Sequence, residues 1–301
     1  MKKIYFSLVI ICLTISSSYS QVGYAGLQFL KYGVSTRSLG MGDVSSSFGF
    51  DAAAAYDNPA LLSTDDHSSI QISHKTWFAD TKVEFLGLKT VAKNFSFSLF
   101  LNSTLIPDIP IRTIPGPATG MFDVHYFATG ISTARKFSND FSLGIGVKIL
   151  YEKFFVDDAT GLALDFGMRK VLENNLSLGA SVSNVGSMSK LRNAATTIPT
   201  TVRIGGSFPI VFSENKSELL FALDAVDILP EKAMHIHSGF EFTYDKILSL
   251  RFGIQTGYEA KKFFSTGLGI TYNNIIFDYA FVPTESSFEP GHTIGVGYIF
   301  E

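Results

Sequence analysis

From residue 68 onwards, the chain repeats stretches in which apolar side chains alternate with small or polar ones. Clear examples run over residues 141–152, 176–183 and 248–255. Successive side chains of a strand point to opposite faces, so each stretch has one apolar face and one small or polar face. The polar face carries mostly Ser, Gly and single charges, which is not typical of a packed core. The pattern is typical of a membrane β-barrel, with strands of about ten residues, lipid outside and a wetter lumen inside.

The first twenty residues have the features of a secretory signal peptide. Lys2 and Lys3 precede an apolar run at 4–15, and small residues follow as far as Ser20, where we expect cleavage. The apolar run is shorter than the ~20 residues that a membrane-spanning helix needs. Cys12, the only cysteine, lies within this run. The mature chain therefore has no disulfide and no cysteine-based metal site.

Composition favours a membrane sheet over membrane helices. Hydrophobic residues make up 46% of the chain and aromatic residues 14%, yet no 18-residue apolar stretch follows the signal. In a membrane, such a chain satisfies its backbone amides by closing a sheet on itself. The alternative is a secreted soluble β-sandwich or propeller. With 24 Lys and Arg against 27 Asp and Glu, and no basic patch, the sequence excludes a nucleic-acid partner.

We therefore predict an all-β fold, a 14-stranded antiparallel transmembrane β-barrel over residues 67–301. An even number of strands is usual for single-chain bacterial barrels. The fourteen expected strands are 68–78, 82–92, 95–104, 121–136, 141–153, 161–171, 176–186, 200–212, 217–227, 233–244, 247–258, 263–272, 275–282 and 291–300.

The connections between the expected strands alternate in length. Every second one is a short turn rich in Asn, Asp or Lys, such as 93–94 or 273–274. The intervening ones are mostly longer: 105–120, 154–160, 187–199, 228–232 and 283–290, with 79–81 and 259–262 as short exceptions. Outer-membrane barrels have short periplasmic turns and long extracellular loops, so the short turns are assigned to the periplasm.

Charged side chains occupy the face of the strands that would point inwards. Because both signs are mixed, they predict either ion pairs that hold the lumen rigid or a hydrated lumen, and not a strongly selective channel. The predicted lumen-facing charges are Lys148, Glu152, Asp165, Arg169, Arg203, Asp224, Glu241, Arg251 and Asp278.

Residues 21–66 do not alternate, and we expect them to form an N-terminal plug inside the lumen or across its periplasmic mouth. The alanine-rich run at 51–56 favours a short helix, which Asn58 and Pro59 end. Such a segment cannot easily lie in lipid without hydrogen-bond partners for its backbone. The alternative is a flexible periplasmic tail.

Three stretches of this segment resemble the PorV/PorQ family of outer-membrane proteins: 28–31 (QFLK), 35–43 (STRSLGMGD) and 54–62 (AAYDNPALL). Later stretches, at 77–80, 84–87, 134–137, 178–186 and 278–280, are similar to the same family. The resemblance implies a fourteen-stranded barrel similar to the FadL long-chain fatty-acid transporter, in the outer membrane of Gram-negative bacteria. For some members it implies a link to the type IX protein secretion system.

The plug motif also has a physical interpretation. Gly40 and Gly42, on either side of Met41, permit positive φ angles or a close approach to the barrel wall. Arg37 could pair with an inward carboxylate such as Asp165 or Asp224. We interpret Arg37, Gly40, Met41, Gly42, Asn58 and Pro59 as architectural residues.

The sequence lacks the nucleophile and phosphate-binding motifs of common enzymes, and we predict no enzyme activity, cofactor or metal. His125 and His292 are the candidates for a hydrolase histidine by position, without a designated acid. His235 and His237 share one strand face with Glu241 and could bind a metal, although polar lumen lining is the simpler interpretation.

Three functions remain open. The first is an accessory or docking component of type IX protein secretion, with secretion-system or secreted proteins as partners. The second is FadL-like transport of hydrophobic small molecules, and a weaker third is a lipid-modifying enzyme. In each case outer-membrane lipid surrounds the barrel. The 105–120 connection, with four prolines between Pro107 and Pro117, is the candidate loop for contact with a partner or ligand.

Overall fold

The computed structural model describes residues 25–256, 264–283 and 289–300. The predicted signal peptide at 1–20 and the 259–262 connection lie outside these residues, as does most of the 283–290 connection. No helix of the described residues is long and apolar enough to cross a membrane.

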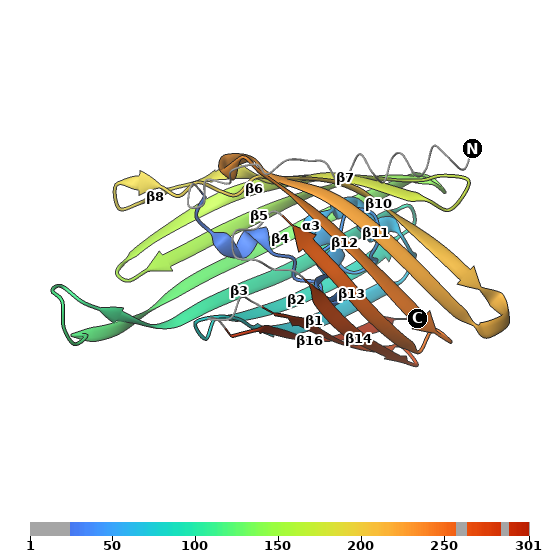
Figure 1. Cartoon of the computed structure of the whole chain (residues 1–301). Coiled ribbons are helices and arrows are strands. Elements are labelled where there is room, and N and C mark those ends of the chain that lie inside the picture. Colours follow the sequence, from blue (N-terminus) through green and yellow to red (C-terminus); the bar gives the residue numbers. More distant parts are fainter. Residues whose placement is uncertain (1–24, 257–263, 284–288, 301) are drawn as a thin grey trace.

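Fourteen strands form one closed antiparallel barrel, which confirms the predicted fold (Figure 1). Sequence neighbours pair with each other, β1 pairs with β16, and β7 pairs with β10. The barrel strands are β1 (Ser68–Thr76), β2 (Lys82–Ala92), β3 (Phe95–Ile111), β4 (Gly120–Ser138), β5 (Phe141–Phe154), β6 (Asp157–Val171), β7 (Ser177–Met188), β10 (Thr201–Phe212), β11 (Ser217–Ile228), β12 (Ala233–Tyr244), β13 (Leu248–Thr256), β14 (Ser265–Tyr272), β15 (Ile275–Val282) and β16 (Gly291–Phe300).

The loop predicted at 105–120 is wrong in its extent. β3 and β4 continue beyond their neighbours as a two-stranded ribbon, in which Ile109 pairs with Phe122 and Ile111 with Gly120. Pro110 is tolerated because this part of β3 has no partner on its other side, where a central strand would need an N–H donor. A bulge beside Asp108, whose φ is 56°, restores pairing after Pro107. The ribbon projects from the end of the barrel that carries the longer connections (Figure 1).

Two other predicted loops contain strand structure. The 154–160 connection is much shorter than predicted, because β5 extends to Phe154 and β6 begins at Asp157. The 187–199 connection contains a small hairpin of β8 (Lys190–Leu191) and β9 (Ala194–Ala195). Two more short helical turns, η3 (Ser213–Asn215) and η4 (Leu229–Glu231), lie in the links before β11 and β12.

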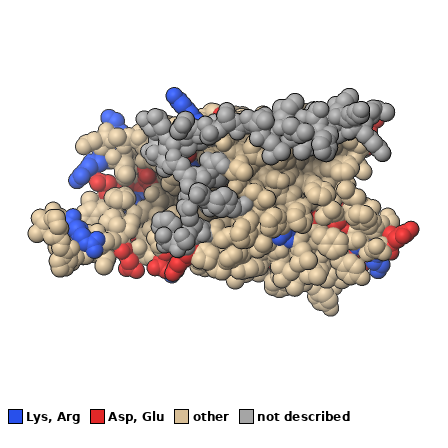
Figure 2. Space-filling model, in the orientation of Figure 1, with Lys and Arg blue, Asp and Glu red and all other residues tan. Residues whose placement is uncertain are grey.

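The outer face of the wall is apolar. Ile145 is 44% exposed and Leu99 is 50% exposed, whereas Ser142 and Ser98, which point to the inner face of the same two strands, are buried. Figure 2 shows that charged side chains on the visible face lie mostly towards the two ends of the barrel. A closed barrel with an uncharged belt is suited to a lipid bilayer, where every backbone group must find its partner within the protein.

The N-terminal residues 25–64 lie inside the ring of strands (Figure 1). They form four short helices: η1 (Gln28–Lys31), α2 (Thr36–Gly40), α3 (Ala52–Asp57) and η2 (Pro59–Ser63). Asp51 caps α3 by accepting a hydrogen bond from the Ala54 N–H, and Asn58 ends α3 and caps η2 through Ala60. We call residues 25–64 the plug. They supply much of the buried apolar surface, so the core of this protein is its filled lumen.

Candidate functional site

The plug lies directly on the inner wall at several points. A Cβ added to Gly253 of β13 would lie 1.9 Å from the Gly42 nitrogen, and one on Gly239 of β12 would lie 2.2 Å from the Met41 carbonyl oxygen. Gly42 itself has a φ of +75°, which side chains other than glycine rarely adopt. Glycines on both surfaces therefore allow backbone-to-backbone packing, and no water-filled gap separates plug and wall at this position.

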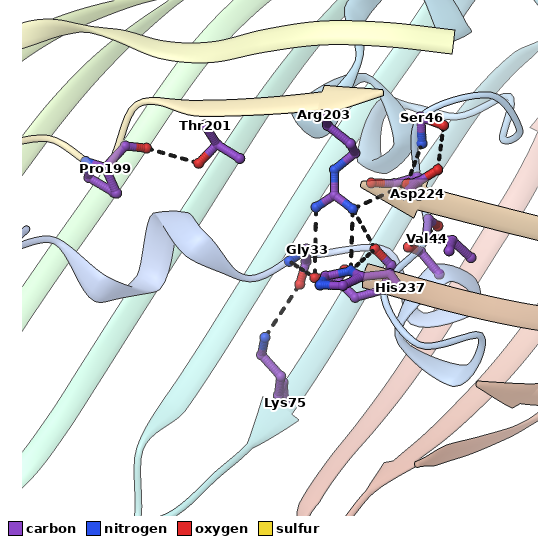
Figure 3. Close-up of polar contacts among 12 residues, drawn as sticks. Gly33, Val44, Ser46, Lys75, Pro199, Thr201, Arg203, Asp224 and His237 are labelled. Carbon is purple, nitrogen blue, oxygen red and sulfur yellow. Dashed lines mark hydrogen bonds and ion pairs between the residues drawn. The ribbon is translucent and has the colours of Figure 1, made fainter. Parts of the chain in front are cut away.

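One cluster of buried charges fixes the centre of the plug (Figure 3). Asp224 of β11 accepts hydrogen bonds from the Ser45 N–H at 2.8 Å, the Ser46 N–H at 3.0 Å and the Ser46 hydroxyl. Arg203 of β10 donates to the Asp43 carbonyl oxygen at 2.7 Å and lies 3.3 Å from Asp224. A buried carboxylate with this many donors is a strong anchor for the chain that supplies them.

A second cluster links α2 to three strands. Arg37 binds Glu241 of β12 through two nitrogens, and Arg251 of β13 binds both Glu241 and Asp278 of β15. The sequence suggests Asp165 or Asp224 as the partner of Arg37, but those carboxylates are paired with Lys148 and Arg203. α2 packs against β13, β14, β15 and β16, which brings Glu241 and not the expected carboxylates to Arg37.

A third cluster lies around Lys148 of β5. Its ammonium contacts Asp165 at 3.0 Å, Asn184 Oδ1 at 3.0 Å and the Tyr56 carbonyl oxygen of α3 at 3.1 Å. Asp165 also accepts the Asn184 N–H at the point where the β6–β7 pairing shifts register. At this bulge the Asp165 carboxylate thus accepts the hydrogen bond that a backbone carbonyl oxygen accepts in a regular strand pair.

The remaining predicted lumen charges are also engaged. Arg169 donates to the Ser47 carbonyl oxygen at 3.0 Å, and Glu152 accepts the Thr196 hydroxyl of the β9–β10 link. Of the nine predicted residues, Lys148, Arg169, Arg203, Asp224 and Glu241 contact the plug directly, while the others bind these or a loop. The lumen charges therefore hold the plug in place.

An apolar region fills the lumen towards its extracellular end. The η1 ring of Phe29 stacks on Tyr126 of β4, with centroids 5.3 Å apart and an interplanar angle of 17°. Deeper in the lumen, the Tyr56 ring packs edge-on against Phe85 and Phe100. The buried members of this apolar cluster are Leu27, Phe29, Leu30, Val34, Ala53, Tyr56, Phe85, Phe100, Ala128, Leu150, Ala159, Ala163, Met188 and Ile198.

This apolar region was not predicted, because nothing in the sequence placed η1 beside it. Leu27, Phe29 and Leu30 belong to a segment without strand or helix periodicity. The available signal was their apolar character within a segment expected in a polar lumen. The ribbon extends the region outwards: Phe122, on the same face as Val124 and Tyr126, packs against Phe154 and Phe155.

A cavity of about 430 Å³ lies at the opposite, periplasmic end. Arg37, Glu241, Arg251 and Asp278 line it, together with polar residues of β1 and β16. The lumen thus has an apolar cluster towards its extracellular end, beside the buried charges of Lys31, Glu152 and Glu231, and a charged cavity at its periplasmic end.

The histidines singled out in the sequence lie in different surroundings. His237 Nδ1 lies 3.0 Å from the Asp43 carbonyl oxygen, and His292 contacts the Tyr279 hydroxyl on the outer face. His125 is exposed. Among residues 25–256, 264–283 and 289–300, no group of three or more His, Cys, Asp or Glu side chains could hold a metal ion.

Asp57 makes the hold on the plug sensitive to pH. Burial raises its pKa to about 6, although Arg203 favours the charged form, and Asp43 adds to the rise. Docking of the plug is therefore favoured below the ordinary pKa of an aspartate, and this contribution is lost as pH rises through 6. We expect Asp57 to favour opening at pH 8 relative to pH 5, measured as the difference in current fluctuations between single wild-type and Asp57→Asn barrels in planar bilayers.

Asp57→Asn, which is neutral at every pH, should remove this dependence. The matched control is Asp66→Asn, because the Asp66 side chain is 78% exposed. An unchanged pH dependence in Asp57→Asn would exclude Asp57 as its source.

The sequence matches no protein-family model and no curated protein. Several solved structures share its fold. The toluene transporter TodX of Pseudomonas putida has a TM-score of 0.63 at 14% identity, with 89% of this chain and 97% of that chain covered. The monoaromatic hydrocarbon channel CymD has a TM-score of 0.62 at 12% identity, with 89% of this chain and 97% of that chain covered. A FadL homologue of Pseudomonas aeruginosa has a TM-score of 0.53 at 11% identity, with 88% of this chain and 97% of that chain covered.

At these identities the likeness shows the fold. None of these three structures is named as a PorV/PorQ protein or as a part of type IX secretion. The closed barrel, its uncharged belt and its shared fold place the protein in a bacterial outer membrane, as predicted.

Proposed function

We propose that this barrel passes hydrophobic small molecules across the outer membrane. In this proposal η1 occupies the apolar binding site until a molecule displaces it. The observation that carries the proposal is the apolar cluster in an otherwise charged lumen, which Leu27 and the η1 residues Phe29 and Leu30 fill. An architectural plug needs no such site, because the charged clusters already fix it to the wall.

η1 makes fewer polar contacts with the wall than the centre of the plug does. Its polar attachments include the Gly26 N–H to Thr197 carbonyl bond at 3.0 Å and the ion pair of Lys31 with Glu231. The residue before it is Leu27, whose φ of 48° lies in the left-handed region and costs of order 1 kcal/mol for such a residue. A single strained turn held mainly by apolar contacts is suited to exchange with an apolar ligand.

The ribbon offers a route to this site from outside. Its inward face carries Ile109, Ile111 and Phe122, and the next inward residues down β4 are Val124 and Tyr126. A hydrophobic molecule could thus move along apolar side chains from the medium to the ring of Phe29. Similar structures named as toluene and monoaromatic hydrocarbon channels support this class of substrate.

The role in type IX secretion rests on the sequence resemblance alone. It would require a secretion-system or secreted protein to dock on the extracellular side, where the ribbon tip exposes Ile114 and Met121. A lipid-modifying activity has less support, since His292 is bound to Tyr279 outside the lumen. Transport is therefore the function that the described residues favour.

Phe29→Ala should increase uptake of a small hydrophobic probe such as toluene. Truncating a buried phenylalanine destabilises a structure by about 3–5 kcal/mol. In this protein the change destabilises the form in which η1 fills the site, so a ligand should displace η1 more easily. Apparent affinity in whole-cell uptake should rise at least about tenfold, which corresponds to about 1.4 kcal/mol. Phe242→Ala, on the lipid face of β12, is the control. Unchanged or lower uptake by a well-folded Phe29→Ala barrel would contradict the proposal.

A further inference from the structure

The outer wall carries an apolar groove that the proposed transport route does not use. A cavity of about 430 Å³ lies on the lipid-facing side of β2, β3, β4 and β5. Its lining side chains are almost entirely apolar, and the groove lies on the opposite side of the wall from the plug. The outward lining residues are Leu88, Thr90, Phe97, Leu99, Ile131, Thr133, Ile145 and Val147.

The strand register explains the groove. Phe97, Thr133 and Ile145 lie side by side on three strands, since Thr133 pairs with Phe97 on one side and Ile145 on the other. Thr133 is the smallest of the three, so it leaves a depression between two large side chains. Its Oγ1 is buried and has no hydrogen-bond partner in the part of the chain that the structure describes.

A cation lies beside the groove at its periplasmic side. Arg135 follows Thr133 by two residues on the same face of β4, about 7 Å away along the strand, and lies near the turn to β5. Its guanidinium lies 5.3 Å from the Phe95 ring centroid and 4.9 Å from that of Phe137. The two rings orient an exposed cation at the height where barrels carry their aromatic girdle. Lys93, in the neighbouring β2–β3 turn, adds a second exposed charge.

We propose that this groove binds one phospholipid of the periplasmic leaflet. An acyl chain would lie over Thr133 between Phe97 and Ile145, and the phosphate would contact Arg135. The apolar groove and the cation at its periplasmic side match the acyl chain and the phosphate of a phospholipid in their order. The site does not depend on transport through the lumen.

Native mass spectrometry of the purified full barrel, with added phosphatidylglycerol, tests this site. The wild type should retain one lipid. Thr133→Phe, which fills the groove, should weaken retention about tenfold, and Arg135→Gln should weaken it by a similar factor because a charge-assisted contact is lost. Arg135→Gln should not change retention of diacylglycerol, which lacks the phosphate. Ile149→Phe, on the lipid face outside the groove, is the control and should retain lipid normally.

Thr133→Leu provides a milder filling variant if Thr133→Phe does not assemble, as judged by heat-modifiable gel mobility. Equal lipid retention by the wild type and the filling variants would overturn the proposal. Unchanged lipid retention combined with reduced uptake of toluene would also overturn it, since the groove would then be an opening for the transported molecule.

Discussion

A disulfide between Gly26, two residues before η1, and Thr196 in the extracellular link before β10 should abolish uptake of hydrophobic molecules. A Cβ built on Gly26 lies 3.6 Å from the Thr196 Cβ, within the ~3.5–4.5 Å range of disulfides. Gly26→Cys with Thr196→Cys also removes the Thr196 methyl group, which would otherwise lie 2.1 Å from the new Cβ. The rest of the chain after the predicted signal has no cysteine, so the pair is unambiguous.

The oxidised double variant should take up no more toluene than cells without the barrel, and a reductant should restore uptake. Each single cysteine variant is a control and should remain active under both conditions. Full uptake by a completely oxidised double variant would show that transport does not need η1 to move. The barrel could then still be a channel, but by a route that leaves η1 in place.

Asp224→Ala should release the centre of the plug. Asp224 accepts hydrogen bonds from Ser45 and Ser46 and contacts Arg203, all buried. A hydrogen bond to a charged group contributes about 1.5–3 kcal/mol, so losing even one should raise the open population at least about tenfold. Planar-bilayer recordings should show larger and more frequent conductance steps than the wild type shows.

Asp227→Ala is the matched control, because Asp227 lies on the same strand but faces outwards. Asp224→Asn, which keeps one acceptor oxygen, should have an intermediate effect. Wild-type conductance in a folded Asp224→Ala barrel would mean that the Arg203–Asp224 cluster does not hold the plug.

Alternation predicted every barrel strand, because a wall between lipid and lumen imposes opposite environments on successive residues. Alternation did not predict the strand residues that lie beyond the wall, where lipid and lumen no longer face the two sides of a strand. β3 and β4 continue past the wall as a ribbon, in which the two strands pair with each other and no longer with β2 or β5. Pro107 and Pro110 there resemble a loop in sequence. A bulge and an unpaired edge let them remain in a strand.

The contacts of the plug could not be derived from the sequence. Arg37 pairs with one of the predicted inward carboxylates, but the partner is Glu241, 204 residues away, and not Asp165 or Asp224. Choosing among several inward carboxylates requires the path of the plug through the lumen, which glycines such as Gly253 determine by their lack of a side chain. The role of Phe29 was missed for the same reason, since the apolar cluster is assembled from η1, α3 and the strands β2 to β7.

The central claim is that η1 and a hydrophobic ligand occupy the same site. The most direct measurement is the rate of disulfide formation in the double variant Gly26→Cys with Thr196→Cys, purified in the reduced state and then oxidised. With saturating toluene, displaced η1 should form the disulfide at least about tenfold more slowly, in proportion to its docked population. An equal-sized polar solute should not change the rate. The same rate with and without toluene would contradict the account.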